Sequence, residues 1–176
     1  QQLATSGAGM LMLESTAINN QGRITLRDLT LTNNNNENSI NKLVLNLRTI
    51  SNIPLGLQIS HAGRKGSSQV PWIKSNTSLN KDQKGWGTVA PSPIKRDSNW
   101  ARPKELSDSQ IYKLICDYKQ TAMRAKRIGF DALEIHMAHG YLLHQFFSNI
   151  SNRRKDNYGG NIDNRCRLIV EIVDQV

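Results

Sequence analysis

The stretch FDALEIHMAHGYLLHQFFSNISNRRKDNYGG, residues 130–160, decides which fold this chain of 176 residues is expected to adopt. It opens with an alternating pattern in which Leu133 and Ile135 fall on one face of an extended chain, and Glu134 and His136 fall on the other. The pattern predicts a β-strand that has one apolar face and carries polar groups at its end.

Donor side chains gather directly after this predicted strand. His136, His139 and Tyr141 lie within six positions, and Gly140 marks a turn among them. Two imidazoles and a phenol at the end of a buried strand can hold an oxygen atom that gains negative charge, and can deliver a proton beside it. The alternatives are a purely structural histidine and a zinc site that also uses His144, but a fourth ligand and the glutamate-bearing helix of metalloproteases are both missing from the pattern. We therefore expect an active site without a metal ion.

The composition is that of a soluble globular protein, with 38% hydrophobic and 21% charged residues. No apolar run approaches the ~20 residues that span a bilayer, so no membrane partner is expected. The net charge of +9 comes from scattered lysines and arginines, without the basic runs interleaved with aromatic residues that would favour nucleic acid as a partner. We expect a solvated basic surface, which would also attract an anionic nicotinamide cofactor. Cys116 and Cys166 both fall in predicted helices, which indicates reduced thiols and a cytoplasmic location.

Strands and helices alternate along the chain. Ser107 and Gln110 form a capping-box pattern at a helix start, and Gly129 stands where that helix should end. Residues 19–36 end in four asparagines and are predicted to form a loop. Residues 66–106 hold three tryptophans and are predicted to be one long irregular segment, whose tryptophans either line a cleft or pin the segment to the body of the fold.

The expected elements, in order, are a strand at 9–16, a helix with its apolar face at Ile40, Leu43, Val44, Leu47 and Ile50, a strand at 55–61, the capped helix, the strand that ends at His136, and a last helix with Ile162, Cys166, Ile169, Val173 and Val176 on one face.

This alternation predicts a parallel sheet with helices outside it. A Rossmann arrangement would need a glycine-rich turn after the first strand, and residues 14–20 lack one. In the strand at 55–61, the polar Gln58 lies between two apolar residues and needs a partner, which is either another core group or a ligand.

Several long motifs resemble one known family. They are GFDALEIHMAHGYLLHQFFS at 129–148, SNRRKDNYGG at 151–160, NRCR at 164–167, HAGRK at 61–65, GWGTVAPSPI at 85–94 and INNQGRIT at 18–25. Together they resemble the Old Yellow Enzyme family of FMN-dependent ene-reductases, and most of all its bacterial branch of NADPH dehydrogenases and xenobiotic reductases. Met137, Phe147 and Asn149 depart from the residues usual there, but none belongs to the proposed donor set.

The resemblance implies an α/β fold of the (β/α)8 TIM-barrel type, which typically needs about 250 residues. Residues 1–176 would cover strands two to four of that barrel with their helices, so we expect a fragment of a single FMN-binding domain that includes the long loop 66–106. The first strand and the last four would lie elsewhere. Because such barrels bind phosphate through the loops after strands seven and eight, residues 1–176 alone should not hold FMN tightly.

The resemblance also implies an FMN-dependent oxidoreductase that passes hydride from NADPH or NADH to activated alkenes or nitro compounds. His136 and His139 would bind the oxygen atom of the substrate, Tyr141 would protonate carbon, and Gln58 and Ser15 would contact the flavin ring. The alternatives are a flavin barrel of the dienoyl-CoA reductase type, and an inactive remnant or split-gene fragment without catalysis of its own. The implied partners are a small-molecule substrate and either a second copy of the chain or a complementing fragment.

Overall fold

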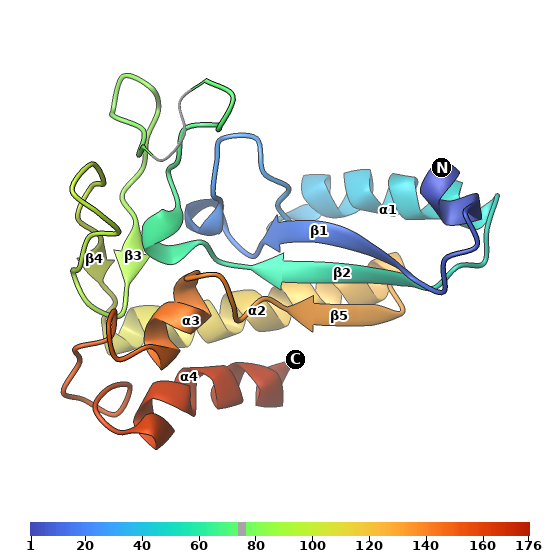
Figure 1. Cartoon of the computed structure of the whole chain (residues 1–176). Coiled ribbons are helices and arrows are strands. Elements are labelled where there is room, and N and C mark those ends of the chain that lie inside the picture. Colours follow the sequence, from blue (N-terminus) through green and yellow to red (C-terminus); the bar gives the residue numbers. More distant parts are fainter. Residues whose placement is uncertain (74–76) are drawn as a thin grey trace.

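A three-stranded parallel sheet forms the centre of the computed structural model, which describes residues 1–73 and 77–176 (Figure 1). Its strands β1 (Leu11–Ala17), β2 (Leu55–Ser60) and β5 (Ala132–Ile135) lie side by side in the order β1-β2-β5. The predicted strands are thus confirmed, with ends displaced by one or two residues.

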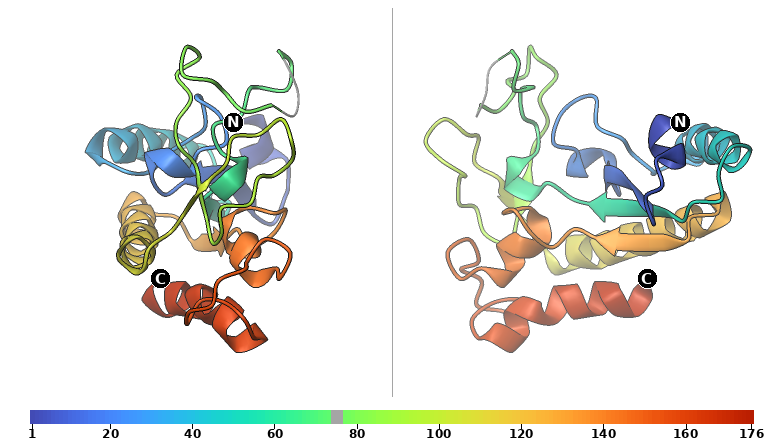
Figure 2. Two further views of the ribbon diagram at one scale, coloured as in Figure 1. Left: turned by 90° about the vertical axis from the view of Figure 1, so that its left-hand side faces the viewer. Right: turned by 45° about the vertical axis from the view of Figure 1, so that its right-hand side comes forward.

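Long helices connect these strands. Helix α1 (Asn34–Arg48) runs between β1 and β2, and helix α2 (Asp108–Ile128) runs between β2 and β5. Both helices lie on the same side of the sheet (Figure 2). Parallel neighbours require such crossovers, because the chain must return to the edge from which the previous strand started. Short 3-10 turns complete the connections: η1 (Gln2–Thr5), η2 (Asn20–Gly22) and η3 (Gly63–Lys65).

The two faces of the sheet differ in polarity. Leu55, Leu57 and Ile59 of β2 are fully buried and share one hydrophobic cluster with residues of α1 and α2. The other face carries Gln58 of β2, which stands in register with Glu134 of β5. Because successive side chains of a strand point to opposite faces, the alternating sequence of β2 produces both faces at once.

Helix α1 begins where the sequence predicts the end of a loop. Asn33 lies in an extended conformation, and its side chain accepts a hydrogen bond from the backbone N–H of Asn36 at 3.0 Å. Asparagine at this position satisfies a free N–H of the first helical turn, so the asparagine tract starts the helix and does not belong to the loop. The predicted apolar face of α1 is partly correct. Ile40, Val44 and Leu47 are buried, whereas Leu43 and Ile50 are exposed.

Helix α2 has the ends that its sequence predicts. The Ser107 side chain and the Gln110 side chain form the reciprocal capping box. Gly129 ends the helix with a φ of 93°, a left-handed conformation that glycine adopts without steric cost. No helix in the described part of the chain is both long enough and apolar enough to cross a membrane.

The described residues between η3 and α2, 66–73 and 77–107, are irregular, as predicted, except for two short parallel strands that the sequence does not signal. These are β3 (Val89–Ala90) and β4 (Lys104–Glu105). Trp100 is buried and pins this segment to the body, whereas Trp72 is exposed. The indole N–H of Trp86 donates to the backbone oxygen of Gln21 at 3.0 Å.

Two further helices follow β5. Helix α3 (Leu142–Phe147) is short and was not predicted, and α4 (Ile162–Gln175) begins at the cap residue Asn161. Leu168 and Ile172 of α4 are fully buried, because α4 packs on α2 and α3. The predicted apolar face is partly wrong for this helix. Cys166 and Ile169 are half-buried, and Ile169 packs on the core, but Ile162, Val173 and Val176 are exposed.

Candidate active site

Polar side chains collect at the carboxyl ends of the parallel strands, where ligands bind in α/β sheets. His136 and the turn that carries His139 and Tyr141 follow β5 directly, whereas Gln58 and Ser15 lie within β2 and β1. All five are the residues expected from the sequence, and the structure joins three of them in direct contact.

His136, His139 and Tyr141 form a compact ring cluster. The His136 and His139 ring centres lie 5.1 Å apart with their planes at 82°, and the His136 and Tyr141 rings lie 4.9 Å apart at 88°. Both contacts are edge-to-face, the arrangement that aromatic rings prefer. The three side chains therefore converge on one small region of space.

Hydrogen bonds define the donor atoms of this cluster. The backbone N–H of Ala138 donates to Nδ1 of His136 at 3.1 Å, so a neutral His136 carries its proton on Nε2. That Nε2 faces Nδ1 of His139 at 3.3 Å. Burial, together with the neighbouring His139, lowers the pKa of His136, which keeps the ring neutral near pH 7. An oxygen atom placed beside both rings could accept the Nε2–H of His136 in place of Nδ1 of His139.

The turn after β5 is held in a strained conformation. His139 has a φ of 57° and Gly140 a φ of 70°, both in the left-handed region that most side chains avoid. Lys65 donates to the backbone oxygen of His139 at 2.7 Å, and Gln145 donates to that of Gly140 at 2.7 Å. The N–H of Gly140 donates to Nδ1 of His144 at 2.8 Å, so His144 supports the turn. Strain of this kind persists only where surrounding contacts enforce it.

Tyr141 stands where it can give up a proton. Burial raises the pKa of Tyr141, the carboxylate of Asp28 raises it further, and Arg96 opposes both. The phenol therefore stays protonated at neutral pH. Lys65 lies 4.8 Å from the centre of the Tyr141 ring in a cation–π contact, which fixes the ring beside the strained turn.

The side-chain amide nitrogen of Gln58 has a hydrogen-bond partner. Its amide N–H donates to Oε1 of Glu134 at 2.6 Å, which orients the amide, because a carboxylate accepts and cannot donate. None of the described residues donates to the carbonyl oxygen of Gln58. The hydroxyl of Ser15 is paired with that of Ser60 at 2.6 Å. This edge thus offers an amide acceptor and adaptable hydroxyls to a planar ring that carries N–H and C=O groups.

The sequence indicated no role for several residues that complete the cluster. Lys65 lies inside the HAGRK motif and Gln145 inside the motif at 129–148, which could have signalled them, but Asp28 and Arg96 carry no local pattern that points to the site. Within residues 1–73 and 77–176, no three histidine, cysteine or acidic side chains are placed to hold a metal ion.

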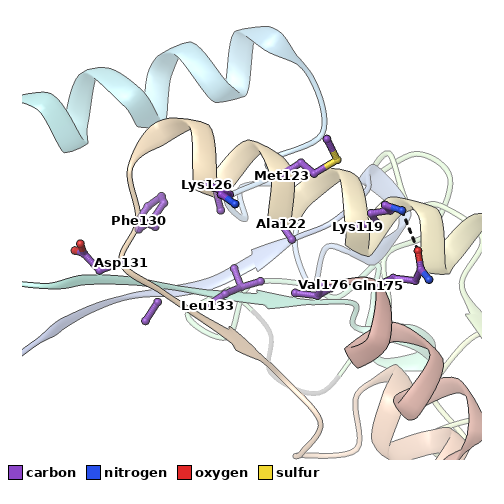
Figure 3. A pocket seen from close by; sticks show the side chains of 11 residues that line it. Lys119, Ala122, Met123, Lys126, Phe130, Asp131, Leu133, Gln175 and Val176 are labelled. Carbon is purple, nitrogen blue, oxygen red and sulfur yellow. Dashed lines mark hydrogen bonds between the residues drawn. The ribbon is translucent and has the colours of Figure 1, made fainter.

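A cavity of about 430 Å³ lies elsewhere, between α2, the start of β5 and the end of α4 (Figure 3). Phe130, Leu133 and Val176 line it, and across it Lys119 donates to Gln175 at 3.0 Å (Figure 3). Because it lies at the opposite end of β5 from His136, this cavity is no part of the candidate active site.

Comparisons with known proteins agree on one family. The family model described as NADH:flavin oxidoreductase / NADH oxidase matches residues 1–176. An NADH:flavin oxidoreductase from Gibberella zeae is 42% identical over 173 residues, which are 97% of this chain and 42% of that protein. An NADPH dehydrogenase from Listeria innocua is 41% identical over 98% of this chain and 46% of its own length.

Solved structures lead to the same family. Morphinone reductase superposes with a TM-score of 0.82 at 29% identity, over 97% of this chain and 46% of that structure. The chain therefore spans about half the length of the curated relatives and structures that it matches. The expected partial (β/α)8 barrel and the resemblance that implied it are both confirmed.

Proposed function

Because this chain belongs to the NADH:flavin oxidoreductase / NADH oxidase family, we propose that the protein carrying it is an FMN-dependent ene-reductase of the Old Yellow Enzyme type. It takes hydride from NADPH or NADH and reduces activated alkenes or nitro compounds. The single observation that supports this most is the contact of His136, His139 and Tyr141 at the end of β5, with ring centres 5.1 and 4.9 Å apart.

The residues on the open face of the sheet fit a flavin ring. The free carbonyl of Gln58 suits a ring N–H, and the hydroxyl of Ser15 can turn toward a ring oxygen or nitrogen. FMN, when bound, supplies a carrier that accepts hydride from the nicotinamide and passes it on. The pairing of Gln58 with Glu134 places the amide without help from the ligand, so little ordering entropy is lost on binding.

The histidines bind and polarise the substrate. Neutral His136 and the neighbouring His139 present N–H groups to the carbonyl or nitro oxygen, and these hydrogen bonds strengthen as that oxygen gains negative charge. The Lys65 contact to the backbone oxygen of His139 holds the second imidazole in its strained turn, so the pair is organised before the substrate arrives.

Tyr141 delivers the proton. Its raised pKa keeps the hydroxyl protonated at neutral pH, and its ring lies edge-on to His136, beside the oxygen that the histidines bind. A proton given to the carbon next to the polarised group completes reduction of the double bond. Arg96 favours the phenolate that remains, since a nearby cation stabilises the charged form.

Stopped-flow spectroscopy of the two half-reactions tests this function. The whole protein that carries this chain, purified and loaded with FMN, is mixed anaerobically with NADPH or NADH, and loss of the oxidised-flavin absorbance is followed. Mixing the reduced protein with 2-cyclohexenone or a nitroaromatic compound should then restore that absorbance. A protein that takes up no FMN, or whose reduced flavin reacts with oxygen but with no alkene or nitro compound, would contradict the proposal.

A further inference from the structure

Three cations from two segments meet beside Tyr141. Arg64 and Lys65 belong to η3, and Arg96 belongs to the irregular segment that precedes α2. We call Arg64, Lys65 and Arg96 the cationic lip. Two of the three are held by backbone carbonyl oxygens, which are neutral partners and leave the positive charge in place.

Direct contacts position each member of the lip. Nη1 of Arg64 donates to the backbone oxygens of Ile94 and Lys95, both at 3.2 Å, which joins η3 to the segment that carries Arg96. Lys65 lies 4.8 Å from the Tyr141 ring centre. The guanidinium of Arg96 lies 4.6 Å from the ring centre of Trp100, and that indole is only 2% exposed. Arg96 is thus stacked on a fixed platform.

The three charges act on one another and on the site. Arg96 lowers the pKa of both Lys65 and Arg64, and in each case burial is the larger cause. It also lowers the pKa of Tyr141. The acids Asp28 and Glu134 act on Tyr141 and His136. The pKa values of Arg64 and Lys65 are lowered by burial and by neighbouring cations, and none of the described acids offsets that shift. Like charges kept this close destabilise each other, and a bound anion would relieve that repulsion.

We propose that the cationic lip binds an anionic group, a carboxylate or a phosphate, on the molecule that occupies the site defined by His136, His139 and Tyr141. This inference rests on the proposed function and extends it to a substrate class: alkenes or nitro compounds that carry an acid group beside the reducible one. The reducible group and the acid group of such a substrate are bound at different places. The histidines bind the oxygen that gains charge during reaction, and the lip binds the charge that is present throughout.

Guanidinium chemistry suits this role. The planar fork of Arg96 can meet two oxygens of a carboxylate or phosphate together, and Lys65 adds a mobile point charge. Phosphates of the nicotinamide cofactor have the same chemistry as the acid group of a substrate. The experiment must therefore separate these two sources.

Two nearly isosteric phenols test the lip by binding, without turnover. 4-Hydroxyphenylacetate and 4-hydroxyphenylacetamide differ in one carboxylate, and under the proposed function each is expected to place its phenol on the histidines over the flavin. Titration of the oxidised, FMN-loaded protein, followed by the long-wavelength charge-transfer band, gives both Kd values. The carboxylate should bind more tightly than the amide, and added salt should weaken only the carboxylate.

Variants assign the effect to Arg96. Arg96→Ala should weaken 4-hydroxyphenylacetate by about fivefold, as expected for a partly exposed ion pair, and leave the amide within about twofold. Arg96→Lys should restore most of the loss. Arg102→Ala is the matched control, because Arg102 is exposed on the same segment and does not shift the pKa of Tyr141 or Lys65.

Each outcome bears on the proposal. If Arg96→Ala lowers only the affinity for NADPH in the reductive half-reaction, the cationic lip binds a phosphate of the cofactor. The anion-binding role is then correct, but the inferred class of acidic substrates is wrong. If neither the carboxylate phenol nor NADPH is affected, the lip has no anion-binding role and the inference is wrong. If neither phenol binds the unmodified protein, the proposed function itself fails, and this inference falls with it.

Discussion

Two neighbouring strands end in a histidine, and the two histidines have different surroundings. His61 follows β2 and His136 follows β5, and the strands stand in register side by side. His61 is 2% exposed and accepts a hydrogen bond from the N–H of Gly63 at 3.0 Å. His136 is 8% exposed and contacts His139 and Tyr141. Position at a strand end therefore does not make a histidine functional.

Close packing explains the difference. A methyl group in place of the Gly22 hydrogen would come within 2.8 Å of the His61 ring, so η2 seals this imidazole from one side. Burial lowers the pKa of His61 to about 4, although the charge of Asp117 opposes the shift. The imidazole after β2 is thus packed against η2, whereas the rings after β5 contact one another. The predictions below test this contrast between the β2 turn and the β5 turn.

The largest effect is expected at the proton donor of the β5 turn. Tyr141→Phe should slow reoxidation of the reduced flavin by 2-cyclohexenone by roughly 10²–10⁴-fold, the usual contribution of a positioned general acid. Reduction by NADPH should stay near its normal rate, because no proton reaches carbon in that step. Stopped-flow measurement of both half-reactions gives the comparison, with the exposed Tyr112→Phe as the control. Equal slowing of both steps would make Tyr141 a structural residue.

The two turns should also differ in ligand binding. Replacing both His136 and His139 with alanine removes two hydrogen-bond donors to a phenolate, each worth about 1.5–3 kcal/mol. The Kd of 4-hydroxyphenylacetamide, followed by the charge-transfer band, should rise accordingly. His61→Asn should leave that Kd unchanged. If the Kd is unchanged in the double variant, the histidines of the β5 turn do not bind the phenol oxygen.

One buried side chain joins the two turns. Gln145 donates to the backbone oxygens of Ala62 at 3.2 Å and Gly140 at 2.7 Å, and accepts from the N–H of Arg64 at 3.2 Å. Gln145→Ala leaves these buried groups without partners and should lower the free energy of unfolding by about 3 kcal/mol.

Urea denaturation of the FMN-free protein measures this loss. Gln120→Ala on the exposed face of α2 is the control and should change stability little. A variant at Gln145 as stable as the control would show that the two turns are independent.

The smallest expected effect concerns pH and the β2 turn. The pKa of His61 is about 4 in the folded protein and near its ordinary value of about 6.5 when unfolded, so the unfolded chain binds a proton first as the pH falls. The stability that this contributes is complete above about pH 6.5 and is lost as the pH falls toward 4. Between pH 7.5 and pH 5 the loss should be about 2 kcal/mol.

Urea unfolding at both pH values tests this linkage. His61→Gln should remove most of the pH dependence, and the part that remains reflects His136, whose pKa burial also lowers. His139→Gln, at an exposed position, should keep it. An unchanged slope in the His61 variant would show that this imidazole is not held neutral by burial.

Local patterns in the sequence were enough to predict much of the fold. The alternation of strands and helices, the capping box of Ser107 and the left-handed Gly129 are all present as predicted. Each depends on residues a few positions apart, whose preferences act through the backbone whatever surrounds them. The same holds for His136, His139 and Tyr141, which one short turn is bound to bring together.

Other features depended on contacts between distant residues. The sequence pattern missed Leu168 and Ile172, the most buried residues of α4, because packing on α2 and α3 decides which side of that helix is buried. The Asn33 cap was hidden in a tract of identical residues. Neither error could be corrected from local spacing, since several faces or start points satisfy the same periodicity.

The sequence by itself determined the family, the order of the elements and the donor set of the β5 turn. Only the tertiary structure decided that His61 packs against η2 whereas His136 contacts His139 and Tyr141. It also decided that Lys65 lies on the Tyr141 ring and that Arg96 is close enough to lower the pKa of Tyr141. Lys65 donates to the backbone oxygen of a residue 74 positions away in sequence, at 2.7 Å. Burial and charge depend on which segments fold against one another, and the residues on either side of Arg96 do not encode its partners.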